Sequence, residues 1–147
     1  MAVGYGLAGC LVDFGRDIHA VGTPPSRPAW HVGLENPERP GSSWGSVGAE
    51  NVGIATSGDY CRFFEYENIR YGHIIDPRTG RPVRNRVLAV SIVASSCLEA
   101  GVLSTAAFVL GKDEGMELIE DSFGMEGCMF MENGLRQSGG FLKYVVQ

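Results

Sequence analysis

The order of the secondary-structure patterns limits the fold of this chain more than any other feature of its sequence, because two helix patterns come together late, after a series of strand patterns. The first helix pattern begins after the serines at 95–96, where Glu99 lies three residues beyond the second serine and completes a capping box. Apolar residues then recur at helical spacing as far as Leu110, and Gly111 is suited to end the helix. A second amphipathic pattern covers 112–123.

Strand patterns lie on both sides of these helices. Alternating or continuous apolar residues predict strands at 9–18 with a bend at Gly15, 30–34, 51–56, 63–66, 69–75, 87–93, 127–131 and 141–146. The pair 63–66 and 69–75 is expected to form a hairpin, and 87–93 is expected to lie centrally in its sheet. The Pro-, Gly- and Ser-rich segment 36–48 predicts a loop. Runs of strands with grouped helices are typical of an α+β fold with a largely antiparallel sheet.

Length and charge narrow the class of protein. A chain of 147 residues fits one domain, 1–147, with a real hydrophobic core. Its net charge of -5 argues against a nucleic-acid partner. Four arginines do cluster between 78 and 86, and they fit either a phosphate site or a solvated turn. No stretch approaches the roughly 18 apolar residues that a membrane span needs.

The first residues of the chain do not indicate a cellular compartment. Residues 1–10 lack the basic start of a signal peptide, so the localisation stays unknown. Residues 1–6 run almost at once into a strand pattern, as expected for a chain entered partway through a fold.

The four cysteines at 10, 61, 97 and 128 are widely spaced and form no C-x-x-C pair. This spacing argues against a zinc site. Free buried thiols are the default expectation, and two disulfides in an exported protein are the alternative.

His73 is the most prominent candidate for chemistry, because it ends a strand pattern and an acid-proline turn follows it at once. Histidine can exchange a proton near neutral pH, and Pro77 and Gly80 constrain the backbone around it. A rigidly held titratable group fits a catalytic site. A capped turn whose histidine only binds the backbone is the structural alternative.

Two hydroxyl-rich segments accompany this turn. The segment 55–60 ends a strand with small polar residues that suit close approach to a ligand or an ordinary turn. In the first helix, Gly101, Ser104 and Thr105 share one face. The two hydroxyls either bond back to helix carbonyls or serve as oxygen ligands for magnesium, which would be a poor site without a carboxylate.

Four segments occur in an order and spacing that resembles the C-terminal half of the ApbE family of FAD:protein FMN transferases. They are Leu-Val-Asp-Phe-Gly-Arg-Asp-Ile at 11–18, Ala-Thr-Ser-Gly-Asp-Tyr at 55–60, His-Ile-Ile-Asp-Pro-Arg-Thr-Gly at 73–80 and Glu-Ala-Gly-Val-Leu-Ser-Thr-Ala-Ala-Phe-Val-Leu-Gly at 99–111. The resemblance covers nearly the whole chain. It implies that the two helices pack on one face of the sheet.

The resemblance also implies an activity, in which FMN is transferred from FAD to a threonine hydroxyl of an acceptor protein with the help of Mg²⁺. By motif position, His73 matches the catalytic histidine of the family. The residues expected to bind the flavin substrate are Ile74, Asp76 and Thr79, and those expected to bind the metal are Ser104 and Thr105.

The chain departs from the family pattern at three places. Gly101 stands where the family has a metal-binding aspartate, Arg16 replaces the second glycine of the first motif, and the N-terminal half of the family fold is absent. The alternative function is therefore a truncated or degenerate domain that binds flavin or a protein partner without catalysis. Half of a larger fold should leave an uncovered surface, so a homo-oligomer is expected. Relatives are often periplasmic or membrane-anchored.

Overall fold

A six-stranded antiparallel sheet forms the centre of the molecule, in a computed structural model that describes residues 6–146. In spatial order its strands are β1 (Gly9–Phe14), β2 (Asp17–Gly22), β5 (Val52–Gly58), β10 (Val87–Ala94), β11 (Glu126–Met131) and β12 (Gly134–Gln137). Strand β10 lies between β5 and β11, so the central place predicted for it is confirmed. The expectation for the first five residues lies outside the described part of the chain.

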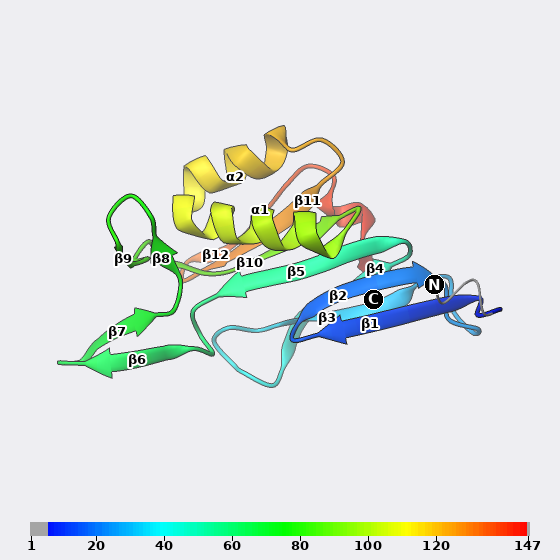
Figure 1. The fold of residues 1–147 in the computed structure, drawn as a ribbon, viewed down its shortest axis with the longest axis horizontal. Coiled ribbons are helices and arrows are strands. Elements are labelled where there is room, and N and C mark those ends of the chain that lie inside the picture. The colour runs from blue at the N-terminus through cyan, green and yellow to red at the C-terminus, as the bar shows by residue number, and fades with distance from the viewer. Residues whose placement is uncertain (1–5, 147) are drawn as a thin grey trace.

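Two helices, α1 (Cys97–Leu110) and α2 (Lys112–Asp121), lie over one face of this sheet (Figure 1). The Ser96 hydroxyl accepts a hydrogen bond from the backbone N–H of Glu99 and donates one to the Glu99 carboxylate. The predicted N-cap at Ser96 and its pairing with Glu99 are therefore present. Gly111 ends α1 with a φ of 85°, a conformation that favours glycine. The predicted α+β fold with both helices on one face is confirmed.

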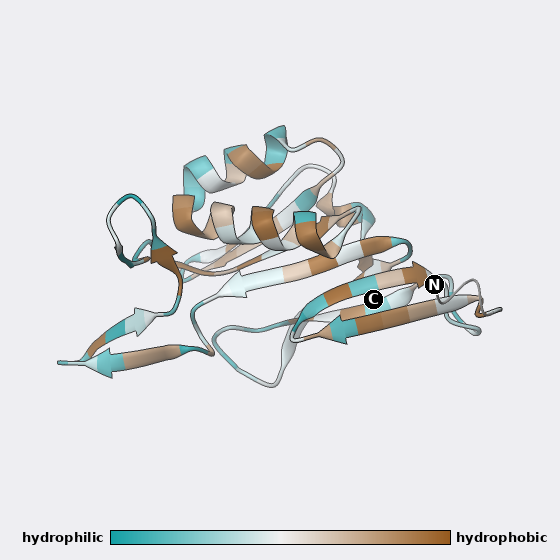
Figure 2. Ribbon diagram, in the orientation of Figure 1, coloured by the Kyte–Doolittle hydropathy of each residue, from teal (hydrophilic) through white to brown (hydrophobic). Residues whose placement is uncertain are grey.

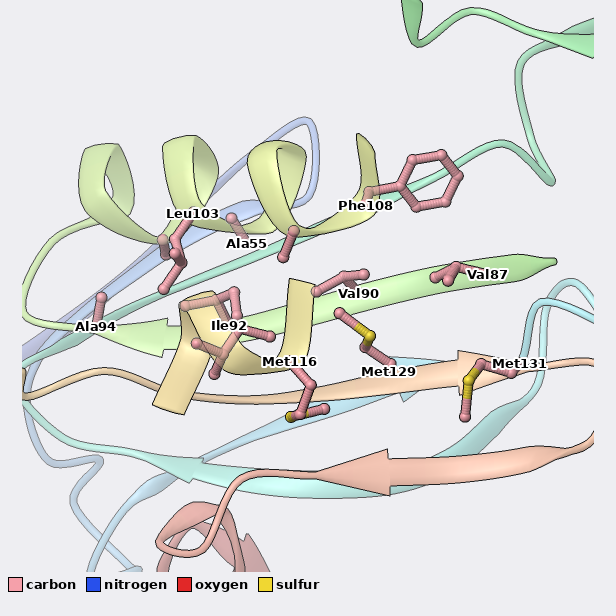
Figure 3. Close-up of a cluster of buried hydrophobic side chains, with 13 residues drawn as sticks. Ala55, Val87, Val90, Ile92, Ala94, Leu103, Phe108, Met116, Met129 and Met131 are labelled. Carbon is pink, nitrogen blue, oxygen red and sulfur yellow. The ribbon is translucent and has the colours of Figure 1, made fainter. Parts of the chain in front are cut away.

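Side chains on the helix-facing side of the sheet form the first core. Val90 and Ile92 of β10 alternate toward the helices, where they meet Phe108 of α1 and Met116 of α2 (Figure 3). All four side chains are almost completely buried. This packing fixes α1 beside the end of β5, which is the place where the candidate site forms.

The opposite face of the central sheet is covered by a second sheet of β13 (Val145–Val146), β4 (Ser43–Ala49) and β3 (Trp30–Glu35). Val47 of β4 and Leu34 of β3 pack against Ile54 and Val93 of the central sheet. The molecule therefore has three layers, one of helices and two of strands.

Strand β4 corrects the prediction of a loop at 36–48. Its composition is typical of a loop, but Val47 pairs with Val32 and is fully buried. Gly48 is needed for close packing, since a Cβ there would lie 2.9 Å from the Val146 side chain. Burial of alternate residues outweighs the weak strand propensity of serine and glycine.

The predictions at the two ends of the chain were also wrong in part. The segment 9–18 is not one bent strand, because Gly15 and Arg16 both have positive φ and form the tight turn of the β1–β2 hairpin. At 141–146 a 3₁₀ turn, Phe141–Lys143, precedes the short β13, and it places the Phe141 ring in the core. Strand β12, which was not predicted, pairs with β11.

Two small hairpins project from the body beyond β5 (Figure 1). The first joins β6 (Phe63–Tyr66) to β7 (Ile69–Gly72), as predicted, through Glu67 and Asn68 at positive φ. The second joins β8 (Ile75–Asp76) to β9 (Arg81–Pro82). The strand expected at 69–75 is interrupted at 73–74, so His73 lies between the hairpins. Within residues 6–146, no helix is both long and apolar enough to cross a membrane.

Candidate functional site

A cleft of about 1350 Å³ lies beside α1 and collects the three segments that the sequence singled out. Thr56, Ser57 and Gly58 reach it from the end of β5, His73 and Ile74 from the link between the hairpins, and the α1 face from Cys97 to Leu110 forms another wall. Elements more than forty residues apart in the chain thus meet at one site. This convergence is what a ligand-binding cleft requires.

Three hydroxyl groups form a cluster in this cleft. The Ser57 Oγ lies 2.9 Å from the Ser104 Oγ and 2.9 Å from the Thr105 Oγ1. Ser57 points toward α1 because it is paired with Val90, whose side chain faces the helices. Ser104 is completely buried, whereas Thr105 is exposed to the cleft. We call Ser57, Ser104 and Thr105 the hydroxyl triad.

The hydroxyl triad does not by itself fit a magnesium ion. Mg²⁺ prefers charged oxygen ligands, and hydroxyls supply no negative charge. Gly101, one turn before Thr105, has no side chain, and a Cβ built there would have no atom within 4 Å. In the part of the chain that the structure describes, no three His, Cys, Asp or Glu side chains are grouped to hold a metal.

Within residues 6–146, one ring nitrogen of His73 has a hydrogen-bond partner and the other has none. Its backbone N–H donates to the Arg62 carbonyl oxygen at 3.2 Å, and its Nδ1 lies 3.2 Å from the same oxygen. A carbonyl oxygen only accepts hydrogen bonds, so Nδ1 carries the proton in the neutral ring and Nε2 keeps its lone pair. The side chain is exposed at the cleft, which suits a proton acceptor.

The turn after His73 is stabilised by the carboxylate of Asp76. The Asp76 carboxylate accepts hydrogen bonds from the backbone N–H of Arg78 and from the Arg78 guanidinium, at 2.9 and 3.0 Å. These bonds lower the pKa of Asp76 below its usual value. Asp76 and Thr79 line a neighbouring pocket of about 890 Å³ instead of the main cleft. Of the predicted flavin contacts, Ile74 alone lies in the cleft with His73.

Arg16, which marked a departure from the expected motif, connects the β1–β2 turn to the cleft wall. Its guanidinium lies 2.7 Å from the Glu35 carboxylate and 3.1 Å from the Cys61 sulfur. The Tyr60 hydroxyl donates to the same carboxylate at 3.0 Å. Burial, together with this carboxylate, raises the pKa of Tyr60 above its ordinary value.

The sequence predicted some of these residues and missed others. Motif positions identified His73, Ser104 and Thr105. Ser57 belongs to the segment 55–60 that the sequence singled out, but its contact with α1 depends on strand register. Arg62 was not identified, because its contact with His73 joins the two ends of a hairpin. All four cysteines are free thiols, as expected, but the expectation that they are buried is wrong in part, because Cys61 is exposed and Cys10 and Cys97 are half-buried. Cys128 is buried, and burial raises its pKa to about 12.

The sequence of this chain matches one protein family and several of its members. The ApbE family sequence model matches residues 2–129. The FAD:protein FMN transferase of Vibrio cholerae is 37% identical over 116 residues, which cover 78% of this chain and 35% of that protein. The FAD:protein FMN transferase of Treponema pallidum is 35% identical over 151 residues, which cover 96% of this chain and 42% of that protein.

Solved structures agree with the sequence relatives. The crystal structure of the ApbE protein of Thermotoga maritima matches with a TM-score of 0.84 and 31% identity, over 95% of this chain and 45% of that one. The flavin transferase ApbE of Vibrio cholerae matches with a TM-score of 0.80 and 30% identity, over 97% and 46%. The chain spans less than half the length of these relatives. By sequence motifs, sequence relatives and fold, the chain belongs to the ApbE family.

Proposed function

We propose that this chain takes part in the transfer of FMN from FAD to a threonine hydroxyl of an acceptor protein. The observation that carries the proposal is the cleft in which a free His73 Nε2 lies on the same surface as the hydroxyl triad. The name FAD:protein FMN transferase, borne by relatives in two species, supports both the flavin substrate and the protein acceptor.

The reaction needs a proton acceptor and a place for phosphate. In the proposed step, the threonine oxygen attacks the phosphorus of the FMN half, and the bond from that phosphorus to the bridging oxygen of the diphosphate breaks. His73 Nε2 takes the threonine proton, and AMP leaves with the bridging oxygen. Ile74 in the cleft, and Asp76 and Thr79 in the neighbouring pocket, are proposed to contact FAD. General-base help of this kind contributes about 10²–10⁴-fold to a rate.

Magnesium is the part of the family chemistry that this chain supports least. When bound, a metal would offset negative charge on the diphosphate. Ser104 and Thr105 occupy the positions that resemblance assigns to metal ligands, but without a carboxylate at Gly101 the donors present do not fit Mg²⁺. A metal-loaded state would therefore need an acidic ligand at the position that Gly101 leaves empty.

Incorporation of FMN into a threonine-containing acceptor tests the proposal. The chain is incubated with FAD and acceptor, with and without Mg²⁺, and the acceptor is examined by mass spectrometry for covalent FMN. We expect His73→Gln to lower the initial rate by about 10²–10⁴-fold. His31→Gln is the matched control, since His31 is an exposed histidine on β3 in the other sheet.

Two outcomes would contradict the proposal. No covalent FMN at high concentrations of the chain would overturn catalysis by this polypeptide. An unchanged rate in His73→Gln would overturn the role of His73 as base and leave the transfer itself standing.

A second candidate function is flavin binding without catalysis. Gly101 in place of an acidic residue favours it, because the hydroxyl triad then lacks a charged metal ligand. Quenching of flavin fluorescence on addition of the chain to FAD, without FMN transfer under any condition, is the result expected from this function.

We also infer that copies of this chain assemble with one another. Exposed apolar side chains lie beside the cleft on β1 and α1, where a second copy would cover them.

A further inference from the structure

One face of the β6–β7 hairpin is made of aromatic and apolar side chains. Paired residues of neighbouring strands, and alternate residues of one strand, lie on the same side of a sheet. The register of the hairpin therefore gathers four side chains on this side: Phe64, Tyr66, Ile69 and Tyr71. We call them the hairpin apolar face. The Phe64 and Tyr71 rings stack with their centroids 5.0 Å apart, and Phe64 and Tyr66 are each more than half exposed.

The opposite face of the hairpin is turned toward the body of the molecule. A Cβ at Gly72 would lie 2.6 Å from the Cβ of Asp59, which follows β5. The Arg70 guanidinium donates to the Asp59 carbonyl oxygen at 2.8 Å and lies over the Phe63 ring. A two-stranded hairpin is only marginally stable alone, so these contacts hold it in place. They leave the hairpin apolar face directed away from Asp59.

The hairpin apolar face continues, through Tyr71, into the neighbouring pocket of about 890 Å³. The Arg84 guanidinium carbon lies 5.9 Å from the centre of the Tyr71 ring, at cation–π distance. Arg81 also lines the pocket, and in the described part of the chain neither arginine has a carboxylate within ion-pair distance. Asp76, the sole acid among the described lining residues, is paired with Arg78. Positive charge thus lies beside apolar surface.

This pocket adjoins the cleft that contains the proposed base. Arg78, Val109 and Leu110 line both hollows. His73 follows directly after β7, the strand that carries Tyr71. A polypeptide that lies along the hairpin apolar face and enters the pocket would therefore have its next residues beside His73, with the α1 side of the cleft left open for flavin.

The chemistry of this surface fits a protein segment that carries a carboxylate. Aromatic residues and arginine are enriched at the centres of protein interfaces, and a guanidinium binds a carboxylate through paired, charge-assisted hydrogen bonds. An anionic lipid surface fits less well. The projecting end of the hairpin carries Glu65 and Glu67, whereas the unpaired arginines lie in the pocket.

We propose that the hairpin apolar face and Arg84 dock the acceptor protein, through a segment near its threonine that carries a carboxylate and apolar side chains. The inference deepens the proposed function and rests on it for the identity of the partner. Asp76 and Thr79 stay available to FAD, because they belong to β8 and the turn after it, whereas Arg84 follows β9. Docking of the acceptor can fail while flavin transfer holds.

Fluorescence anisotropy of labelled peptides, added to the unaltered chain, tests the inference. One peptide carries a threonine flanked by aspartate and phenylalanines, a second has asparagine for the aspartate, and a third has serines for the phenylalanines. We expect the first to bind about fivefold more tightly than the second, the effect of one partly exposed ion pair. It should bind about tenfold more tightly than the third, which buries less apolar area. Equal affinities of all the peptides, or no binding of any, would overturn the inference.

Matched variants locate the docking surface. Arg84→Gln should weaken binding of the aspartate peptide about fivefold and leave that of the asparagine peptide unchanged. Tyr66→Ser should weaken both, and it is preferred to a change at Phe64, whose ring stacks within the hairpin. Arg27→Gln and Leu142→Ser are the controls, since both residues are exposed and line neither hollow. Variants that bind no more weakly than their controls would overturn the assignment.

Steady-state FMN transfer separates this inference from the proposed function. Arg84→Gln should raise the KM for the aspartate peptide and leave kcat and the KM for FAD unchanged. An unchanged KM for the peptide would overturn the inference and leave the transferase standing. Peptide binding that depends on Arg84, in a chain that transfers no FMN, would support the docking surface and overturn catalysis. Binding to phosphatidylglycerol vesicles that Tyr66→Ser abolishes, without discrimination between peptides, would assign the face to a lipid surface and overturn the inference.

Discussion

At the scale of single residues, Gly101 leaves the α1 wall of the cleft without a side chain and lowers the stability of the helix. A glycine inside a helix destabilises it by about 0.5–1 kcal/mol relative to alanine. Because a Cβ at Gly101 would meet no atom within 4 Å, we expect Gly101→Ala to raise the free energy of unfolding by about that amount. Urea denaturation followed by circular dichroism measures the change.

Gly115 of α2 is the control for this prediction. A Cβ at Gly115 would collide with the Ala107 carbonyl oxygen and lie 2.7 Å from the end of the Met129 side chain. Gly115→Ala should therefore destabilise the protein. If both alanine variants were destabilising, Gly101 would have a structural role that its open surroundings do not explain.

Glu35 contributes stability that depends on pH. Its pKa is lowered by the Gly41 backbone N–H, by the Tyr60 hydroxyl and by the Arg16 charge. A carboxyl with a folded-state pKa below its unfolded value of about 4.3 stabilises the folded state above that pH and loses this effect as the pH falls through the folded-state value. Between pH 6 and pH 3, Glu35→Gln should therefore lose less unfolding free energy than the unaltered chain.

Urea unfolding at these two pH values measures the difference. Glu38→Gln serves as the control, since Glu38 is exposed in the neighbouring loop. A loss of stability in Glu35→Gln equal to that of the unaltered chain would contradict the role assigned to the Glu35 carboxylate.

Site residues that belong to short sequence motifs could be predicted, whereas those placed by strand register or by contacts between distant segments could not. His73, Ser104 and Thr105 belong to short motifs, so their types and spacing were enough. Ser57 joins them only because β5 pairs with β10 in a register that turns it toward α1. Arg62 depends on a contact across the β6–β7 hairpin, which no local pattern encodes.

At the scale of elements, the helices were predictable and part of the sheet was not. Ser96 and Gly111 mark the ends of α1 by chemistry that acts within a few residues. Strand β4 has no such local signal, since its serines and glycines resemble a loop and its stability comes from pairing with β3. The same holds for β12, which is set by its partner β11.

The contact between β5 and the start of α1 predicts a large effect of one methyl group. A Cβ at Gly53 would overlap the backbone of Ser96 and Cys97, so the helix would have to move away from the sheet. We expect Gly53→Ala to lower the free energy of unfolding by about 1–3 kcal/mol, as overpacked cores do. Urea denaturation again provides the measurement.

Gly33→Ala is the control for this strand position. Its Cβ would lie 3.5 Å from the Ser43 Cβ, which is ordinary contact. This variant should change the unfolding free energy by less than about 0.5 kcal/mol. An equally small effect of Gly53→Ala would mean that α1 is not fixed by its first turn.

At the scale of the whole molecule, one part of the central sheet has no covering layer among residues 6–146. Gly53 of β5 faces α1, and it pairs with His19 of β2, which in turn pairs with Val12 of β1. Paired residues of neighbouring strands point to the same side of a sheet, so Val12 lies on the helix-facing side. Phe14, two residues later, lies on that side as well. Val12 is 53% exposed and Phe14 85% exposed. Figure 2 shows the hydrophobic residues that run along β1. The helices cover the neighbouring strands and leave this edge bare.

The outer side of α1 continues this surface. Leu98 is 77% exposed and Val102 63% exposed, and both line the cleft. Val12, Phe14, Leu98 and Val102, which we call the α1–β1 apolar surface, would therefore form one wall of a site that another polypeptide completes.

Exposed apolar surface of this kind promotes association in water, so we expect the purified chain to form dimers or larger assemblies at micromolar concentrations. Sedimentation velocity measures the mass in solution. The double variant Phe14→Glu/Val102→Glu should be monomeric, because a charge buried on association is costly. Leu142→Glu changes an exposed apolar residue of the 3₁₀ turn outside the α1–β1 apolar surface and should leave the assembly intact. A monomeric unaltered chain would show that this surface needs a different protein for its cover, and dissociation by Leu142→Glu alone would place the contact between copies elsewhere.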